Sequence, residues 1–212
     1  IHTKRVVVEK IGNKDFIFLP EAYNAEKSIA RRLSVLLKFP PENPIDVESQ
    51  LDKIEKSCNI QYAELQKQAI ITAVNKGILI LTGGPGTGKT TTLNGIINMF
   101  EKDFLKIALC APTGRAAQRM TEATGRTATT IHRLLEVEWA KNNRPEFRRN
   151  LRNPLDCQAV IVDEMSMVDI FLFSSLLDAL PFGCRLIMVG DSDQLPSVSP
   201  GNVLKDLIDT GL

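Results

Sequence analysis

Apolar residues follow two kinds of pattern along this chain, and the change between them comes at Gly77. After Gly77, segments with helical spacing alternate with nearly continuous apolar runs, which cover Ile78–Leu81, Ile107–Cys110, Ala159–Val162 and Arg185–Val189. Apolar runs that alternate with helices are typical of a parallel sheet buried on both faces. We therefore predict an α/β fold in which helices cover both faces of a parallel sheet.

Before Gly77 the pattern predicts a hairpin followed by helices. Two short apolar runs flank Gly12 and Asn13, a pair suited to a tight turn. Helical spacing then covers residues 22–36, 47–57 and 63–75, and it returns near the end of the chain over 202–209. The proline-rich stretch 40–44 indicates a linker. We expect residues 1–60 to form an N-terminal hairpin and helical region, and residues 61–212 to form the α/β domain.

Composition narrows the class of protein. Of 212 residues, 43% are hydrophobic and 24% charged, as in soluble globular proteins. The formal net charge of +1 gives no overall basic field, so it neither supports nor excludes nucleic-acid binding. No stretch approaches the roughly 20 apolar residues of a membrane span. We expect no membrane association.

The four cysteines show no spacing typical of a metal site, and the two histidines lie far apart in the sequence. A zinc site is therefore not expected. Cys110, Cys157 and Cys184 lie in or beside apolar runs, where a free thiol usually serves as a small core residue. This cysteine usage, Cys58 included, fits a reducing, cytoplasmic location.

The stretch GGPGTGKT, residues 83–90, matches the phosphate-binding loop pattern, and it follows a predicted strand and opens a helix. Backbone N–H groups of such a loop surround phosphate oxygens, and the helix N-terminus adds its positive dipole end. Lys89 is expected to reach the β- and γ-phosphates of ATP, and the Thr90 hydroxyl to ligate Mg²⁺. A glycine-rich turn without a ligand is the alternative. The predicted nucleotide-binding residues are Gly84, Pro85, Gly86, Thr87, Gly88, Lys89, Thr90 and Thr91.

An acidic pair follows the strand predicted over 159–162. Asp163 is placed to hold Mg²⁺, and Glu164 to orient and deprotonate a water that attacks the γ-phosphate. An ordinary acidic strand end is the alternative. The stretch VGDSDQLPSV, residues 189–198, raises a related question, because a buried strand there delivers Gln194 to the sheet edge. If this strand lies between the loop strand and the Asp163 strand, Gln194 becomes a neutral γ-phosphate sensor.

Two short polar stretches each lie directly before a predicted helix. The first is residues 112–115 and the second is residues 129–132. Small hydroxyl residues, free N–H groups and arginines at helix starts suit phosphate contacts with single-stranded nucleic acid. Composition alone favours a solvated helix face for Arg115 and Arg119. Between them and the acidic pair lies an insertion, residues 136–153, which is either a short hairpin or an exposed basic loop.

Four stretches together resemble the first motor domain of the RecD-like superfamily 1 DNA helicases. They are GGPGTGKTTT, APTGRAAQRM leading to TIHRLL, VDEMSMVD and GDSDQLPSVSPG, in the order of that family. The resemblance runs from Tyr62 to Leu212, and the stretch FIFLPEAYNAEKSIARRLSVLL also resembles the segment before that motor. It implies a RecA-like P-loop NTPase fold with ATP and Mg²⁺ as cofactors.

The resemblance also implies roles for single residues. Gln66 corresponds to a glutamine that reads adenine, and Gln194 to one that links the γ-phosphate to the DNA path. Thr113, Arg115, Thr130 and His132 fall in motifs that face single-stranded DNA. With Lys89 and Glu164, Gln194 makes up the expected catalytic set. The insertion falls where the family carries a strand-separating pin at the duplex junction.

The resemblance implies ATP-dependent translocation and unwinding of DNA in the 5′-to-3′ direction, in repair or recombination. The family's second RecA-like domain, with the arginine that reaches the γ-phosphate, has no counterpart in these 212 residues. We therefore expect a monomeric fragment that does not unwind DNA on its own. A relaxase-linked or RNA-directed helicase, and a nucleic-acid-binding module with an incidental ATPase, are the alternatives.

Overall fold

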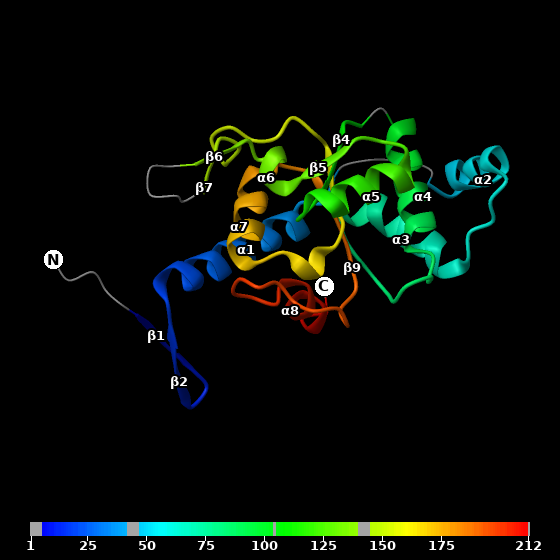
Figure 1. Ribbon diagram of the computed structural model, residues 1–212. Coiled ribbons are helices and arrows are strands. Elements are labelled where there is room, and N and C mark those ends of the chain that lie inside the picture. Colours follow the sequence, from blue (N-terminus) through cyan, green and yellow to red (C-terminus); the bar gives the residue numbers. More distant parts are fainter. Residues whose placement is uncertain (1–5, 42–46, 104, 140–144, 212) are drawn as a thin grey trace.

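The computed structural model describes residues 6–41, 47–103, 105–139 and 145–211. A parallel sheet forms its centre (Figure 1), built from β3 (Ile78–Thr82), β4 (Ile107–Ala111), β5 (Ala128–Thr130), β8 (Ala159–Val162) and β9 (Arg185–Gly190). The strands lie in the order β3-β9-β8-β4-β5. All the strands predicted from the apolar runs are confirmed. The short strand β5 was not predicted, because its sequence Ala-Thr-Thr carries no apolar run.

The helices predicted from periodicity are also confirmed. They and the other helices are α1 (Pro20–Lys38), α2 (Val47–Cys58), α3 (Glu64–Lys76), α4 (Lys89–Lys102), α5 (Gly114–Thr124), α6 (Ile131–Leu134), α7 (Ile170–Ala179) and α8 (Val203–Asp209). A short 3₁₀ turn, η1 (Met165–Met167), follows β8. Part of the stretch predicted as a linker, residues 42–44, lies outside the described residues.

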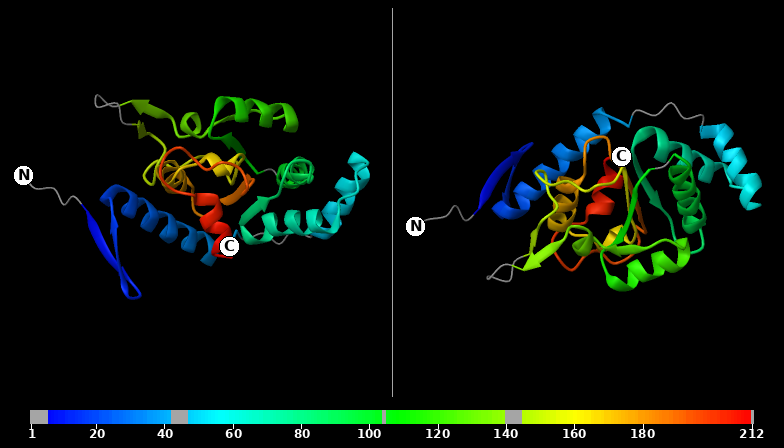
Figure 2. Two further views of the ribbon diagram at one scale, coloured as in Figure 1. Left: turned by 60° about the horizontal axis from the view of Figure 1, so that its bottom comes forward. Right: turned by 90° about the horizontal axis from the view of Figure 1, so that it is seen from above.

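Strand β9 shows why helices cover both faces of the sheet (Figure 2). Side chains alternate across a strand, so Leu186 and Met188 of β9 enter the core that α1, α7 and α8 share. Ile187 and Val189 enter the opposite core, with α2, α3 and α4. Every residue of β9 is buried. Each such aliphatic side chain contributes about 1.5–3 kcal/mol when fully buried, which gives the sheet a rigid frame.

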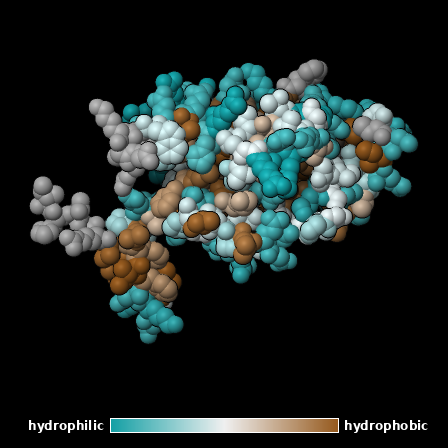
Figure 3. All heavy atoms as spheres, viewed as in Figure 1, coloured by the Kyte–Doolittle hydropathy of each residue, from teal (hydrophilic) through white to brown (hydrophobic). Residues whose placement is uncertain are grey.

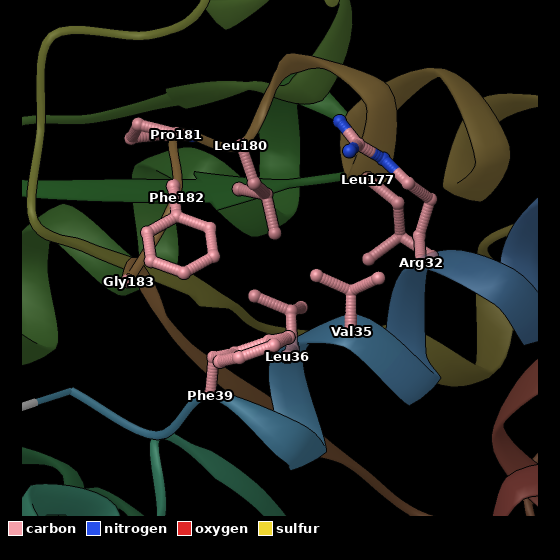
Figure 4. A pocket seen from close by; sticks show the side chains of 9 residues that line it. All are labelled: Arg32, Val35, Leu36, Phe39, Leu177, Leu180, Pro181, Phe182 and Gly183. Atoms are coloured by element: carbon pink, nitrogen blue, oxygen red, sulfur yellow. The ribbon is translucent and has the colours of Figure 1, made fainter.

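The N-terminal helix α1 packs along α7. Its Arg32 donates a hydrogen bond of 3.0 Å from Nη2 to the carbonyl oxygen of Asp178, and its Nε lies 3.3 Å from the Asp178 carboxylate. Phe39 directly follows α1 and Phe182 lies shortly after α7, and the centroids of their rings are 5.6 Å apart (Figure 4). Helix α1 therefore shares a core with the sheet. A domain boundary near residue 60 stays a prediction.

Two antiparallel hairpins stand apart from the main sheet (Figure 1). The first, β1 (Val7–Ile11) with β2 (Lys14–Phe18), confirms the turn predicted at Gly12 and Asn13. It projects from the body and exposes hydrophobic side chains such as Val8 and Ile17 (Figure 3). The second pairs β6 (Val137–Trp139) with β7 (Pro145–Phe147), so the insertion forms a hairpin. Its connecting residues 140–144, Arg144 included, lie outside the described residues.

A search of the described helices finds none with the length and apolar character that a bilayer crossing requires.

Candidate functional site

The glycine-rich loop connects β3 to α4 and ends at Gly88, the N-cap residue of that helix. Gly88 has a φ of 85°, in the left-handed region that favours glycine. A Cβ atom at this position would also lie only 2.5 Å from Nε2 of Gln66. The local path of the loop therefore depends on glycine because of its backbone conformation, and a larger residue would also displace the amide of Gln66. This path leaves the first turn of α4 facing the loop.

Lys89 lies across the loop. Its ammonium group donates hydrogen bonds to the carbonyl oxygens of Gly83 and Gly84, the latter at 2.8 Å. The hydroxyl of Thr87 also donates to the Gly84 carbonyl, at 2.9 Å. Thr90 and Thr91 are exposed in the first helical turn. The loop thus places one cation and several hydroxyl and N–H donors together, which is the donor set that phosphate oxygens require.

Gln66 touches the same loop from α3. Its Oε1 accepts a hydrogen bond of 2.9 Å from the amide of Ala63, and its Nε2 donates one of 3.4 Å to the carbonyl oxygen of Gly88. The side chain therefore joins the start of α3 to the end of the phosphate loop. Its position beside the loop suits an adenine contact, which stays a prediction.

The acidic pair stands at the carboxyl end of β8, next to β4. The amide of Asp163 donates to the carbonyl oxygen of Cys110 at 2.9 Å, and Oδ1 of Asp163 accepts from the amide of Glu164 at 2.8 Å. Glu164 has a φ of 53°, which is uncommon for a residue other than glycine. Such a conformation persists only where the surrounding structure holds it, and it is concentrated at functional sites.

Both carboxyl groups are perturbed by their surroundings. Burial raises the pKa of Asp163, while the Glu164 amide and the positive charge of Lys89 lower it. Burial likewise raises the pKa of Glu164, and the charge of Asp163 raises it further. Opposing charges from Arg119 and Lys89 lower the pKa of Glu164. Two partly buried carboxyls side by side favour a cation between them and the loop, so the donor set fits Mg²⁺ held by Thr90 and Asp163.

These groups line one pocket of about 230 Å³. The pocket joins the loop residues Lys89 and Thr90 to the acidic pair and to Gln194. It forms because β9 lies between β3 and β8, as the sequence predicted, so its carboxyl end opens between the loop and the acidic pair. The amide of Gln194 donates to the carbonyl oxygen of Asp191 at 3.3 Å, which starts the polar segment after β9.

Sequence reasoning missed two residues at this pocket and underrated a third. Asp191 is buried, lines the pocket, and raises the pKa of Glu164. Its place directly after a buried strand was the available signal. At Gly190 a Cβ atom would lie 2.7 Å from a methyl group of Leu204 and 3.3 Å from the amide nitrogen of Met165, so a larger residue would crowd the end of β9. Arg119 was expected to be merely solvated, yet its charge acts on Glu164.

The residues predicted to face DNA start two neighbouring helices. Strand β5 pairs with β4 so that Thr130 lies opposite Ala111, and the segments after both strands reach the same sheet edge. Thr113 accepts a hydrogen bond from the amide of Ala116, and Thr130 one from the amide of Arg133, each at 3.2 Å. Both hydroxyls therefore cap helices. Arg115 is exposed beside them.

His132 differs from the other three, because it packs against the β6–β7 hairpin. Its ring centroid lies 5.9 Å from that of Phe147. The base of the hairpin is held by Arg149, whose Nε donates to Glu136 at 2.8 Å and whose Nη1 donates to the Pro154 carbonyl at 3.1 Å. Arg148 pairs with Glu138. The side chains of Arg148 and Arg149 thus support the hairpin itself, a role that the alternative of an exposed basic loop did not include.

Comparisons with known proteins show which families this chain is similar to. A family model described as an AAA domain matches residues 66–200. The chain is 40% identical over 186 residues to the ATP-dependent RecD2 DNA helicase of Deinococcus radiodurans, an alignment that covers 87% of this chain and 25% of that protein. It is also 40% identical over 169 residues to the RecBCD enzyme subunit RecD of Mycolicibacterium smegmatis, covering 69% of this chain and 30% of that subunit.

The chain therefore spans between a quarter and a third of the length of these curated relatives. Among solved structures, one of two Pif1 helicases at forked double-stranded DNA aligns with a TM-score of 0.47 and 26% identity. That alignment covers 71% of this chain and 38% of the other.

Proposed function

Because this chain belongs to the AAA domain family, whose model matches residues 66–200, we propose that it is the nucleotide-binding motor domain of a RecD-type, ATP-dependent DNA helicase. The observation that carries the proposal is the single pocket in which Lys89, Glu164 and Gln194 meet. The 40% identity to a protein named an ATP-dependent RecD2 DNA helicase supports it.

In this proposal each residue has one task in ATP hydrolysis. Lys89 leaves its loop carbonyls and offsets charge on the β- and γ-phosphates. Mg²⁺, held by Thr90 and Asp163, would neutralise further phosphate charge. Glu164 orients the attacking water and accepts its proton, a role that a raised carboxyl pKa favours near neutral pH. Gln194 hydrogen-bonds the γ-phosphate or the attacking water. When the γ-phosphate leaves, this hydrogen bond is lost, and the change is transmitted to the DNA-binding segments.

DNA lies, in the same proposal, along the carboxyl edge of β4 and β5. There Thr113 and Thr130 cap helices whose first N–H groups, with Arg115, contact the phosphates of a single strand. The β6–β7 hairpin meets the duplex junction as a pin. A second RecA-like domain closes the other wall of the cleft and supplies an arginine to the γ-phosphate. Three buried free cysteines fit the cytoplasm as its location.

The test is ATP hydrolysis and strand displacement by the full-length protein. We expect single-stranded DNA to stimulate hydrolysis more than RNA of the same sequence does. A duplex with a 5′ tail should be unwound, and one with a 3′ tail should not, if movement is 5′-to-3′. Stronger stimulation by RNA would favour an RNA-directed helicase, and the absence of any nucleic-acid stimulation would refute the motor assignment.

A further inference from the structure

A second cleft lies away from the nucleotide pocket, between the β6–β7 hairpin and the start of α7. Its volume is about 420 Å³, within the range of roughly 300–1,000 Å³ typical of small-ligand sites. His132, Pro145 and Phe147 form one wall, and Asp169, Phe171 and Ser175 form the other. The cleft therefore holds aromatic rings on two opposite sides.

The hairpin wall is held in place. Side chains alternate along paired strands, so Trp139, Pro145, Val137 and Phe147 share one face of the hairpin. Phe147 is half-buried against the main core and packs on the His132 ring at 5.9 Å. Trp139 pairs with Pro145 at the outer end of this face and is 63% exposed. An exposed aromatic ring thus lies at the outer end of the hairpin face that carries Pro145 and Phe147.

The opposite wall belongs to the first turns of α7. Phe171 is 37% exposed and faces the cleft as a lining residue. Asp169 caps the helix, since its Oδ1 accepts from the amides of Phe171 and Leu172 at 2.9 and 2.8 Å. This capping fixes the position of a carboxylate at the cleft. The Ser175 hydroxyl donates to the Phe171 carbonyl at 2.8 Å.

The charge of the lining selects the kind of ligand. None of the described residues that line the cleft is a lysine or an arginine, and two, Glu21 and Asp169, are acidic. The Asp169 carboxylate, fixed at the start of α7, disfavours a phosphate group beside it. A flat aromatic ring with amino or imino donors is favoured, because it can stack on the ring walls and hydrogen-bond to a carboxylate. A nucleobase has this chemistry.

We propose that the cleft between the β6–β7 hairpin and α7 is a slot for one unstacked nucleobase of a strand that leaves the duplex junction. The proposal rests on the DNA-unwinding function proposed above. His132 is then a base-contacting residue in the slot, and the phosphate contacts are left to the segments around Thr113 and Thr130. A base held there stays unpaired, so it opposes re-annealing behind the hairpin.

The test is a thermodynamic cycle with the full-length protein. Fluorescence anisotropy measures the affinity for forked DNA in which one abasic nucleotide is moved through the first unpaired positions of each arm. At one position, loss of the base should weaken wild-type binding about tenfold, and Phe171→Ala should weaken binding of intact forks about equally. Combining the two should cost no more than either alone. Phe182→Ala, which removes a 77% exposed ring elsewhere, is the matched control.

Other variants separate a base contact from a folding effect. His132→Phe keeps a ring and should retain fork affinity, whereas His132→Ala should lose it. Each variant is checked by its melting temperature. Additive effects at every abasic position, or a Phe171→Ala variant that melts early and binds forks normally, would overturn the slot. Failure of the wild-type protein to bind forks or to be stimulated by DNA would instead overturn the proposed function.

Discussion

The backbone amide of Asp163 donates a hydrogen bond of 2.9 Å to the carbonyl oxygen of Cys110. This bond joins the acidic pair of the nucleotide pocket to the end of β4, three residues before Thr113. Together with the pairing of β8 and β4, it links the acidic pair to the segment that leads into the helix beginning at Gly114. The two parts of the proposed motor are neighbours by strand pairing, without an intermediate element.

Replacement of Lys89 tests the phosphate loop. In the full-length protein Lys89→Ala should weaken Mg·ATP binding about 10- to 100-fold, as expected when hydrogen bonds to a charged group are lost. Titration with a fluorescent ATP analogue measures the change. Lys102→Ala, at the other end of α4, is the control and should bind normally. Unchanged binding in Lys89→Ala would place the nucleotide elsewhere.

Replacement of Glu164 separates binding from chemistry. Glu164→Gln keeps the size of the side chain but removes the base, so we expect nucleotide affinity near the wild-type value and a hydrolysis rate lower by about 10²–10⁴. Steady-state ATPase assays with single-stranded DNA measure it. Glu48→Gln, an exposed glutamate on α2, should leave both quantities unchanged. Hydrolysis at the wild-type rate would remove Glu164 from the role of base.

The partly buried carboxyl of Asp163 predicts an unusual pH dependence of stability. Burial raises the pKa of Asp163 above its ordinary value of 3.8. The folded state then binds more protons than the unfolded state just above that value, so the contribution of Asp163 to the free energy of unfolding falls as pH rises through this window. At neutral pH its charge destabilises the protein without ligand. Asp163→Asn should raise the melting temperature at pH 7, by roughly 2–4 °C for each kcal/mol gained.

The same variant should lose Mg²⁺-dependent nucleotide binding, which a gain in stability alone does not explain. Asp156→Asn is the matched control, because the pKa of Asp156 is shifted in the opposite direction. Lys106, at 2.7 Å, lowers the pKa of Asp156, so that carboxylate stabilises the fold above its ordinary pKa range. Its replacement should leave the melting temperature unchanged or lower it. A lower melting temperature for Asp163→Asn would contradict the burial argument.

The base of the hairpin predicts a separation of unwinding from ATP hydrolysis. Arg149→Met removes the bonds to Glu136 and Pro154, so the hairpin loses its fixed angle. In the full-length protein we expect strand displacement to fall severalfold while single-strand-stimulated hydrolysis is retained. Arg152→Met, an exposed arginine of the same segment, is the control.

Deletion of residues 140–145 should act in the same direction as Arg149→Met, since it removes the whole connection between β6 and β7 together with Pro145, the first residue of β7. Gel-based strand displacement and ATPase assays on the same preparations measure both activities. An equal loss of the two would indicate a folding defect or a general DNA-binding loop in place of a pin.

The sequence by itself was enough to propose the nucleotide-binding chemistry of this protein. Residues 83–90 lie next to one another in the chain, and so do Asp163 and Glu164, so their roles depend on local geometry at the end of a strand. The four apolar runs and the helical periodicity also sufficed for the sheet and its main helices, because burial on two faces imposes a pattern on every strand. The hypothesis that β9 lies between β3 and β8, which would bring Gln194 toward the γ-phosphate, is confirmed by the strand order.

Only the tertiary structure decided which charges act on the pocket and which surfaces meet. Asp191 and Arg119 affect Glu164 across space, from different elements, and no local pattern encodes such a distance. Strand β5 owes its existence to pairing with β4, since its three residues have little strand character of their own. His132 was assigned by resemblance to the DNA-facing set, but the structure packs its ring on Phe147, fifteen positions later. Such contacts depend on how distant segments fold against each other, which is why the second cleft was not visible in the sequence.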